Sequence, residues 1–183
     1  MKRPWRVTRR LALHEIGEEH ANELHELDSD PRVMRYVGQG RPATRDEISA
    51  VMRRVPRAYA LYPGLGTWRA TRRNSGDFVG WFALKYIPRT SVVEVGYRLR
   101  HAAWGRGFAT EGACSLVEYA FADLDLYRIV GVTHPDNVAS QQVLLKTGMI
   151  DIGWGHYYGR SVRVFEAVHH AGWEPTWPRA RAE

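Results

Sequence analysis

A pair of glycines between a strand-like and a helix-like segment constrains the fold of this chain more than any other feature. In "SVVEVGYRLR", residues 91–100, apolar and polar residues alternate as they do in a strand with one buried face. The loop "HAAWGRGFATEG" (101–112) follows, and over residues 109–121 apolar residues recur at the spacing of one helical face. A second apolar strand, "LYRIVGV", comes next. This order predicts a strand–helix–strand unit whose two strands are parallel.

The other segments predict a mixed α/β fold. Alternation around Leu11 and Leu13 indicates a first strand, and polar-rich segments with helical spacing follow it. Thr44 and Glu47 form a capping-box pattern for a helix that we expect Pro56 to end or kink. The strand-like "GTWRATR" and "FVGWFALKYI" are joined by the turn signal "RNSGD". "NVASQQVLLKTG" predicts a capped helix, "GWGHYYGR" is turn-rich, and "SVRVFEAVH" predicts a last strand.

The length and composition predict one domain over residues 1–183. A chain of 183 residues that is 44% hydrophobic can form one full core. The tail 171–183 has two prolines and little periodicity, so we expect it to be flexible and unstructured.

Charge and cysteine content favour a cytoplasmic protein without a nucleic-acid or membrane partner. The formal net charge is +6, but the basic residues are spread along the chain rather than gathered in one run. No segment approaches the roughly 20 apolar residues of a membrane span. Cys114 is the only cysteine, so no intrachain disulfide forms and a reducing compartment is expected. The eight histidines show no metal-ligand spacing, so we expect no metal.

The glycine loop has the properties of an anion site. A loop that enters a helix gathers unpaired N–H groups at the positive end of the helix dipole. Gly105 and Gly107 would let the main chain approach a phosphate, and Arg106 adds positive charge. The loop matches neither the Walker pattern nor the dinucleotide fingerprint. Taken alone, it is equally compatible with a tight turn that serves packing.

The surroundings of the loop resemble a known family. "EVGYRLRHAAWGRGFATEGACSLVEYAF" followed by "RIVGVTHPDNVASQQVLLKTGM" resembles the GNAT N-acetyltransferase superfamily, nearest to its ribosomal-protein N-terminal acetyltransferase (RimJ/RimL-type) branch. The resemblance covers about residues 8–170. The wider superfamily has the pattern Arg/Gln-x-x-Gly-x-Gly/Ala, and this chain has Ala102 at its first position. The RimJ/RimL-type branch also commonly lacks Arg or Gln there.

The resemblance implies a GNAT fold, a mixed and mostly antiparallel sheet with a central splayed strand pair and flanking helices. It also implies acetyl-CoA as co-substrate. The pantetheine arm would pair with the main chain of the splayed strand, and the turn would wrap the pyrophosphate. The implied cofactor contacts are Tyr97, Arg98, Leu99, Trp104, Gly105, Arg106, Gly107, Phe108, Ala109, Thr110, Asn137 and Ser140.

Amine acetylation needs a proton acceptor for the amine and a proton donor for the departing thiolate. Glu94 is the candidate base, either directly or through water, although a salt-bridged strand glutamate is the alternative. Many superfamily members use a tyrosine farther along this helix as the acid, but "QQVLLK" has none. Ser140 stands where the ribosomal-protein branch has a serine proposed for this role, so the resemblance implies Ser140 as the candidate acid. As alternatives, Ser140 is a first-turn helix serine and Asn137 a helix cap. His134 is a weaker candidate base.

The acceptor is not encoded in any motif. The resemblance implies a primary amine, either a protein N-terminus or a small molecule such as an amino acid, polyamine or aminoglycoside. Tyr157 or Tyr158 would contact it unless, as we favour, they only pack in a hairpin. Transfer from another acyl-CoA, a non-catalytic CoA-binding regulator and a basic nucleic-acid module remain alternatives. Either a monomer or a homodimer is compatible with the sequence.

Overall fold

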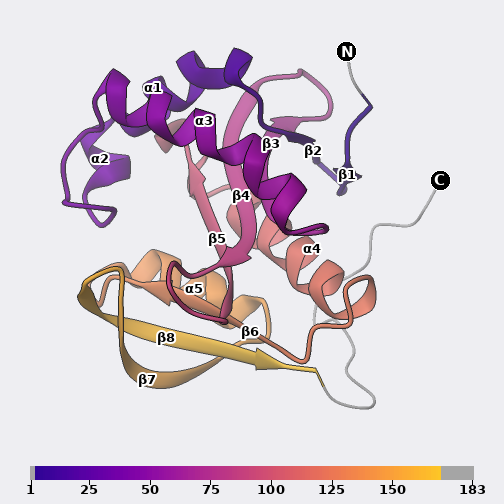
Figure 1. Cartoon of the computed structure of the whole chain (residues 1–183), viewed down its shortest axis with the longest axis vertical. Helices are drawn as coiled ribbons and strands as arrows, with labels where there is room; N and C mark the ends of the chain where they lie inside the picture. Colours follow the sequence, from indigo (N-terminus) through magenta and orange to yellow (C-terminus); the bar gives the residue numbers. More distant parts are fainter. Residues whose placement is uncertain (1–2, 170–183) are drawn as a thin grey trace.

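The computed structural model describes residues 3–169, which form one twisted sheet flanked by helices (Figure 1). Its eight strands lie in the order β1-β2-β3-β4-β5-β6-β8-β7, and only β5 and β6 are parallel neighbours. The strands are β1 (Arg6–Val7), β2 (Leu11–Glu15), β3 (Gly66–Arg72), β4 (Phe78–Tyr86), β5 (Val93–Leu99), β6 (Arg128–Thr133), β7 (Ile150–Tyr157) and β8 (Arg160–Val168). The helices are α1 (Ala21–Asp28), α2 (Pro31–Met34), α3 (Arg45–Leu61), α4 (Phe108–Ala122) and α5 (Val138–Lys146), with 3-10 turns η1 (Glu18–His20) and η2 (His101–Ala103).

The parallel pair at the centre of the sheet separates almost as soon as it forms. β5 and β6 pair at one position, Glu94 with Val130, whereas β5 pairs with β4 along its whole length. In Figure 1, β7 and β8 run across the direction of β4 and β5. The predicted strand–helix–strand unit and splayed central pair are therefore confirmed, and the sheet opens beside β5.

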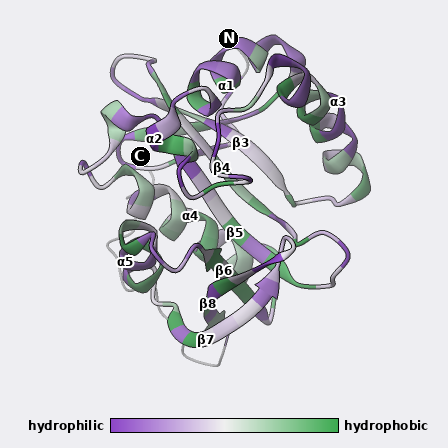
Figure 2. Ribbon diagram, turned by 90° about the vertical axis from the view of Figure 1, so that its left-hand side faces the viewer, coloured by the Kyte–Doolittle hydropathy of each residue, from purple (hydrophilic) through white to green (hydrophobic). Residues whose placement is uncertain are grey.

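Three hydrophobic clusters hold the layers together. The largest one lies between the sheet and α4, where Phe82, Leu116 and Phe121 are almost completely buried. Gly112 is required there, because a Cβ at this position would clash with the Phe82 ring. The second lies under α1 and α3, and the smallest is built mainly from β6 and β8. Figure 2 agrees with this arrangement, since α4 is mostly hydrophobic while α3 mixes purple and green segments.

Two segments differ from what the sequence predicted. α3 continues through Pro56 to Leu61, so Pro56 does not end this helix. Pro56 has no N–H to donate to the Met52 carbonyl, but the helix is assigned on both sides of it. The turn-rich reading of residues 153–160 was wrong, because most of them belong to β7 and to its hairpin with β8. β7 is an edge strand with a mostly exposed surface, and Gly153 and Gly155, which suggest turns in the sequence, lie within it.

The capping box of Thr44 and Glu47 at α3 is confirmed. The predicted tail, residues 171–183, lies outside the described residues. Within residues 3–169, no helix has the length and apolar character needed to cross a membrane.

Candidate functional site

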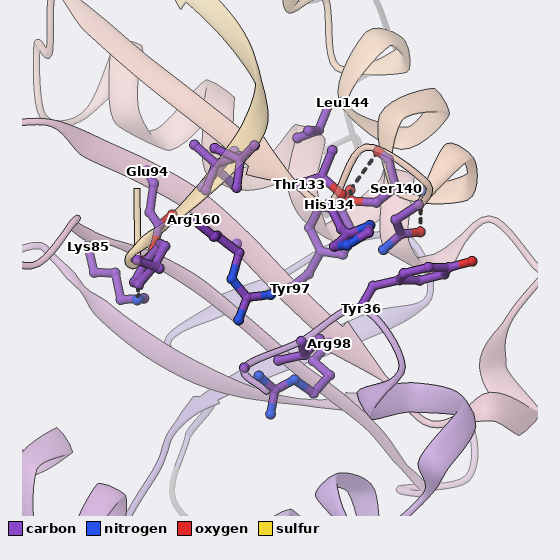
Figure 3. A pocket seen from close by; sticks show the side chains of 18 of the residues that line it. Tyr36, Lys85, Glu94, Tyr97, Arg98, Thr133, His134, Ser140, Leu144 and Arg160 are labelled. Carbon is purple, nitrogen blue, oxygen red and sulfur yellow. Dashed lines mark hydrogen bonds and ion pairs between the residues drawn. The ribbon is translucent and has the colours of Figure 1, made fainter. Parts of the chain in front are cut away.

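A cavity of about 550 Å³ occupies the opening between the diverging strands. It is lined by β4, β5, β6, β8 and α5, together with the loop after α2. In Figure 3, Glu94 and Lys85 lie at one side and Ser140 and His134 at the other. Sites for small ligands usually measure 300–1,000 Å³, so this one has room for the end of a cofactor and a small acceptor.

The glycine loop forms the positive end of a helix, as predicted. Gly105 and Gly107 have φ angles of +69° and +77°, in the left-handed region that favours glycine. Gly107 is the N-cap of α4, and no side chain caps this helix in the described structure. The first intrahelical hydrogen bond runs from Glu111 N to Gly107 O (3.0 Å), so the N–H groups of Phe108, Ala109 and Thr110 have no helical acceptor.

An ion-pair clamp holds this loop to the first strands. Glu111 accepts hydrogen bonds from Thr8 Oγ1 (2.6 Å), Arg10 N (2.7 Å) and Arg10 Nε (2.6 Å). Arg10 also donates to the carbonyl of Arg106 (2.9 Å) and stacks on Phe108. Burial alone would raise the pKa of the Glu111 carboxyl, but these hydrogen bonds outweigh burial and lower it. The loop is therefore fixed by an anchor from the turn between β1 and β2.

The edge of β5 that faces the gap offers free main-chain groups. Arg100 N donates to Val79 O (2.9 Å), and successive residues of a strand direct these groups to opposite sides. The main chain of Arg98 is therefore directed at β4, and those of Tyr97 and Leu99 at the gap. The Leu99 carbonyl accepts a hydrogen bond from the Trp104 indole (2.9 Å), and the Trp104 ring is about half exposed.

Ser140 meets Tyr97 across the gap, and Asn137 caps the helix that carries Ser140. Asn137 caps α5 through a hydrogen bond from Ser140 N to its Oδ1 (3.2 Å), so the capping alternative is present in the structure. The Tyr97 hydroxyl lies 3.1 Å from Ser140 Oγ and donates to the Ser140 carbonyl (3.1 Å). Burial raises the pKa of Tyr97 well above its usual value, so its hydroxyl stays protonated.

Glu94 is buried, 5% exposed, at the point where the two strands part. Its carboxylate accepts a hydrogen bond from the Tyr158 hydroxyl and pairs with Lys85 Nζ at 2.9 Å. Lys85 also donates to the Tyr158 oxygen (3.1 Å). Burial, and then the charge of Glu94, raise the pKa of Tyr158. The carboxylate is thus ion-paired, as expected of a salt-bridged strand glutamate. It also lines the cavity.

The wall toward the N-terminal helices is charged and aromatic. Arg98 pairs with Asp28 of α1, and its guanidinium lies over the Trp81 ring. A second cavity of about 330 Å³, under α1 and α3, shares Trp81, Lys85 and Arg98 with the first. On the other side, Tyr36 approaches His134, with ring centroids 5.3 Å apart (Figure 3).

The sequence missed the side chains that come from remote elements. No sequence motif marked Lys85, Arg10, Arg160 or the hydroxyl of Tyr97. Only the alternation of residues in β4 could have placed Lys85 on the same face of the sheet as Glu94. Tyr158 lines the cavity, contrary to the hairpin-packing reading that was favoured. Cys114 is buried on α4, where burial raises its thiol pKa to about 12, as expected of a packing residue. Among residues 3–169 no group of potential metal ligands gathers.

Comparison with known proteins gives a consistent result. Residues 10–150 match the family described as Acetyltransferase (GNAT) domain. The chain is 38% identical over 153 residues to FsC-acetyl coenzyme A-N(2)-transacetylase of Aspergillus fumigatus, covering 79% of this chain and 64% of that protein, less than two thirds of its length.

Solved structures show the same fold. An acetyltransferase from Agrobacterium tumefaciens str. C58 superposes with a TM-score of 0.78 at 22% identity, covering 92% of this chain and 96% of its own. The ribosomal L7/L12 α-N-protein acetyltransferase RimL, solved with coenzyme A, superposes with a TM-score of 0.74 at 17% identity, covering 89% and 96%.

Proposed function

The chain belongs to the GNAT acetyltransferase domain family, and from that premise we propose that it transfers acetyl from acetyl-CoA directly to a primary amine in a ternary complex. The position of Glu94 carries the proposal. It is a buried carboxylate that faces the cavity, at the one pairing between β5 and β6. Acceptor and donor can meet there without solvent between them.

The residues fit the donor along the length of β5. The N–H groups after Gly107 and the charge of Arg106 would hold the pyrophosphate, and the gap-facing main chain of Tyr97 would pair with the pantetheine arm. When bound, acetyl-CoA supplies the acetyl group as a thioester, so that a C–N bond forms as a C–S bond breaks. Asn137 and Ser140 face the same arm across the gap.

Glu94 would accept the proton that the amine loses. Lys85 and Tyr158 hold its carboxylate in place, and Tyr158 remains protonated because its pKa is raised. On the opposite wall, the Ser140 hydroxyl would donate a proton to the departing sulfur, and Tyr97 would orient it. A fixed donor and a fixed acceptor on opposite sides of the reacting atoms are the arrangement that general acid–base catalysis requires.

Finer assignments accompany the proposal. We place the chain in the RimJ/RimL-type branch on its sequence motifs, as a single domain that is cytoplasmic and acts as a monomer or homodimer. The lone, buried Cys114 agrees with a reducing compartment. The acceptor class is a protein N-terminus or a small-molecule amine.

The test uses the full chain with acetyl-CoA and a panel of amines. Acetyl-CoA binding is measured by calorimetry, thiol release by a colorimetric reagent, and acetylated product by mass spectrometry. We expect saturable binding, and thiol release that depends on the amine and matches the product in amount.

Three outcomes contradict the proposal in different ways. No saturable binding of acetyl-CoA would remove the donor assignment. Binding without thiol release across the panel would indicate the non-catalytic regulator. A strong preference for a longer acyl-CoA would assign another donor, and salt-dependent RNA or DNA binding without CoA competition would support a nucleic-acid module.

A further inference from the structure

Arg160 is a cation without a partner inside the cavity. It is the first residue of β8, is partly buried, and lines the cavity beside Glu94 and Lys85 (Figure 3). Within residues 3–169 it has no ion pair, side-chain hydrogen bond or aromatic stacking partner. The other two cations of the lining are paired, Lys85 with Glu94 and Arg98 with Asp28. The charge of Arg160 is therefore the one left to be matched by a ligand.

The hairpin that carries Arg160 is fixed to the proposed base. Tyr158 and Gly159 form its two-residue turn, with φ angles of +55° and +73°, and Tyr157 pairs with Arg160. Positive φ at both central residues is typical of a type I′ turn, but a tyrosine there is strained unless its surroundings hold it. The contact of the Tyr158 hydroxyl with Glu94 does so. Arg160 thus has a defined position relative to the carboxylate.

The phosphates of the donor do not account for Arg160. β5 runs from Val93, near the hairpin, to Leu99, which touches Trp104 of the glycine loop. At roughly 3.3 Å per residue, Glu94 and Leu99 are about 16 Å apart along this strand. The pyrophosphate assigned to the loop would lie at the far end from Arg160. An anion beside Arg160 has to come from the acceptor.

We infer that the acceptor is an amine that carries a carboxylate, as an amino acid does, and that Arg160 binds this carboxylate while Glu94 faces the amine. The inference rests on the proposed function and selects among its acceptor classes. The planar guanidinium matches a carboxylate through two parallel hydrogen bonds. A polyamine would instead place a second cation near Lys85 and Arg160, where it would be repelled.

The test compares acceptors that differ only in this group. L-leucine is compared with L-leucinamide and L-phenylalanine with L-phenylalaninamide, and a short peptide with glutamate as second residue is compared with its glutamine counterpart. For the wild-type protein we expect kcat/KM to favour the acid by roughly 10- to 100-fold. The amino-acid and peptide pairs show whether the carboxylate belongs to the acceptor itself or to a neighbouring side chain.

Arg160→Gln should abolish that preference and raise the KM for the acid, with the KM for acetyl-CoA unchanged. Arg160→Lys should retain part of it. The acid-to-amide ratio of the wild-type protein is divided by that of Arg160→Gln, because the different intrinsic reactivity of the two amines cancels in this double ratio. Arg57→Gln on α3 is the matched control, since it removes one exposed charge that lines neither cavity.

A binding measurement makes the result independent of turnover. With CoA present, N-acetyl-L-leucine should bind the wild-type protein roughly 10-fold or more tightly than N-acetyl-L-leucinamide, and Arg160→Gln should equalise them. Equal use of acid and amide by the wild-type protein, or a preference that survives Arg160→Gln, overturns the inference. A rise in the KM for acetyl-CoA alone would assign Arg160 to the donor. Failure to acetylate any amine would contradict the proposed function itself.

Discussion

The two ends of β5 build their parts of the site in opposite ways. At the Leu99 end, main-chain N–H groups in one short segment offer a general anion site, held by Arg10 and Glu111. At the Glu94 end, side chains from two separate segments converge: Lys85 of β4 and Tyr158 of the β7–β8 hairpin contact one carboxylate, and Arg160 of the same hairpin lines the same cavity. The first end suits a donor common to a whole family. The second can vary residue by residue and suits an acceptor that differs between members.

The largest effect is expected from breaking the donor end with Gly107→Glu. Its φ of +77° disfavours any side chain, and a carboxylate there would stand where the phosphates are proposed to bind. We expect acetyl-CoA affinity to fall by at least about 100-fold, measured by calorimetry.

Gly76→Glu is the matched control for backbone strain. Gly76 also has a positive φ, +75°, and a Cβ there would meet no atom within 4 Å. It lies in the turn between β3 and β4, so acetyl-CoA affinity should remain. Equal losses in the two variants would show that strain, rather than the loop, is responsible.

Glu94→Gln should slow the transfer step and leave acetyl-CoA binding at the donor end unchanged. A lost general base typically costs 10²–10⁴-fold, so kcat should fall by roughly 100-fold with acetyl-CoA affinity unchanged. Glu26→Gln removes an exposed carboxylate paired with Arg100 and should leave kcat as it is. Unchanged kcat in Glu94→Gln would remove this residue from the mechanism.

The same difference between the two ends of β5 explains how much of each could be predicted from the sequence. "WGRGFATEG" predicted its own loop and the start of the helix after it, because glycine conformation and helix-end polarity depend on neighbouring residues. Glu94 could be placed on a strand face, but Tyr158 reaches it only because β7 and β8 fold back over the opening. Contacts of that kind depend on register between remote strands, which local spacing does not encode.

Tyr158→Phe tests how much the orientation of Glu94 at the acceptor end contributes to the rate. It removes the hydroxyl that orients Glu94 but keeps the ring, so we expect kcat to fall about 10-fold, the worth of one hydrogen bond to a charged group. Because the pKa of Tyr158 is raised, its ionisation should not shape the alkaline side of the pH–rate profile. That side should coincide in wild type and variant, while Tyr127→Phe, at a 73% exposed residue, should change neither rate nor profile. A shift of the alkaline side in Tyr158→Phe would show that the hydroxyl titrates.

The smallest effect concerns the clamp that steadies the donor end. The pKa of Glu111 is lowered on folding from an ordinary value of 4.5, so its stabilisation is present above that pH and is lost as the pH falls through the lower folded value. Glu111→Gln should cost about 1 kcal/mol at pH 7, which corresponds to a Tm lower by a few degrees. The difference from wild type should shrink as the pH falls through the lowered folded pKa of Glu111, because below it both chains are neutral at this position. Glu26→Gln should shift Tm less at pH 7, and an undiminished difference at low pH would mean that Glu111 acts through packing and not through its charge.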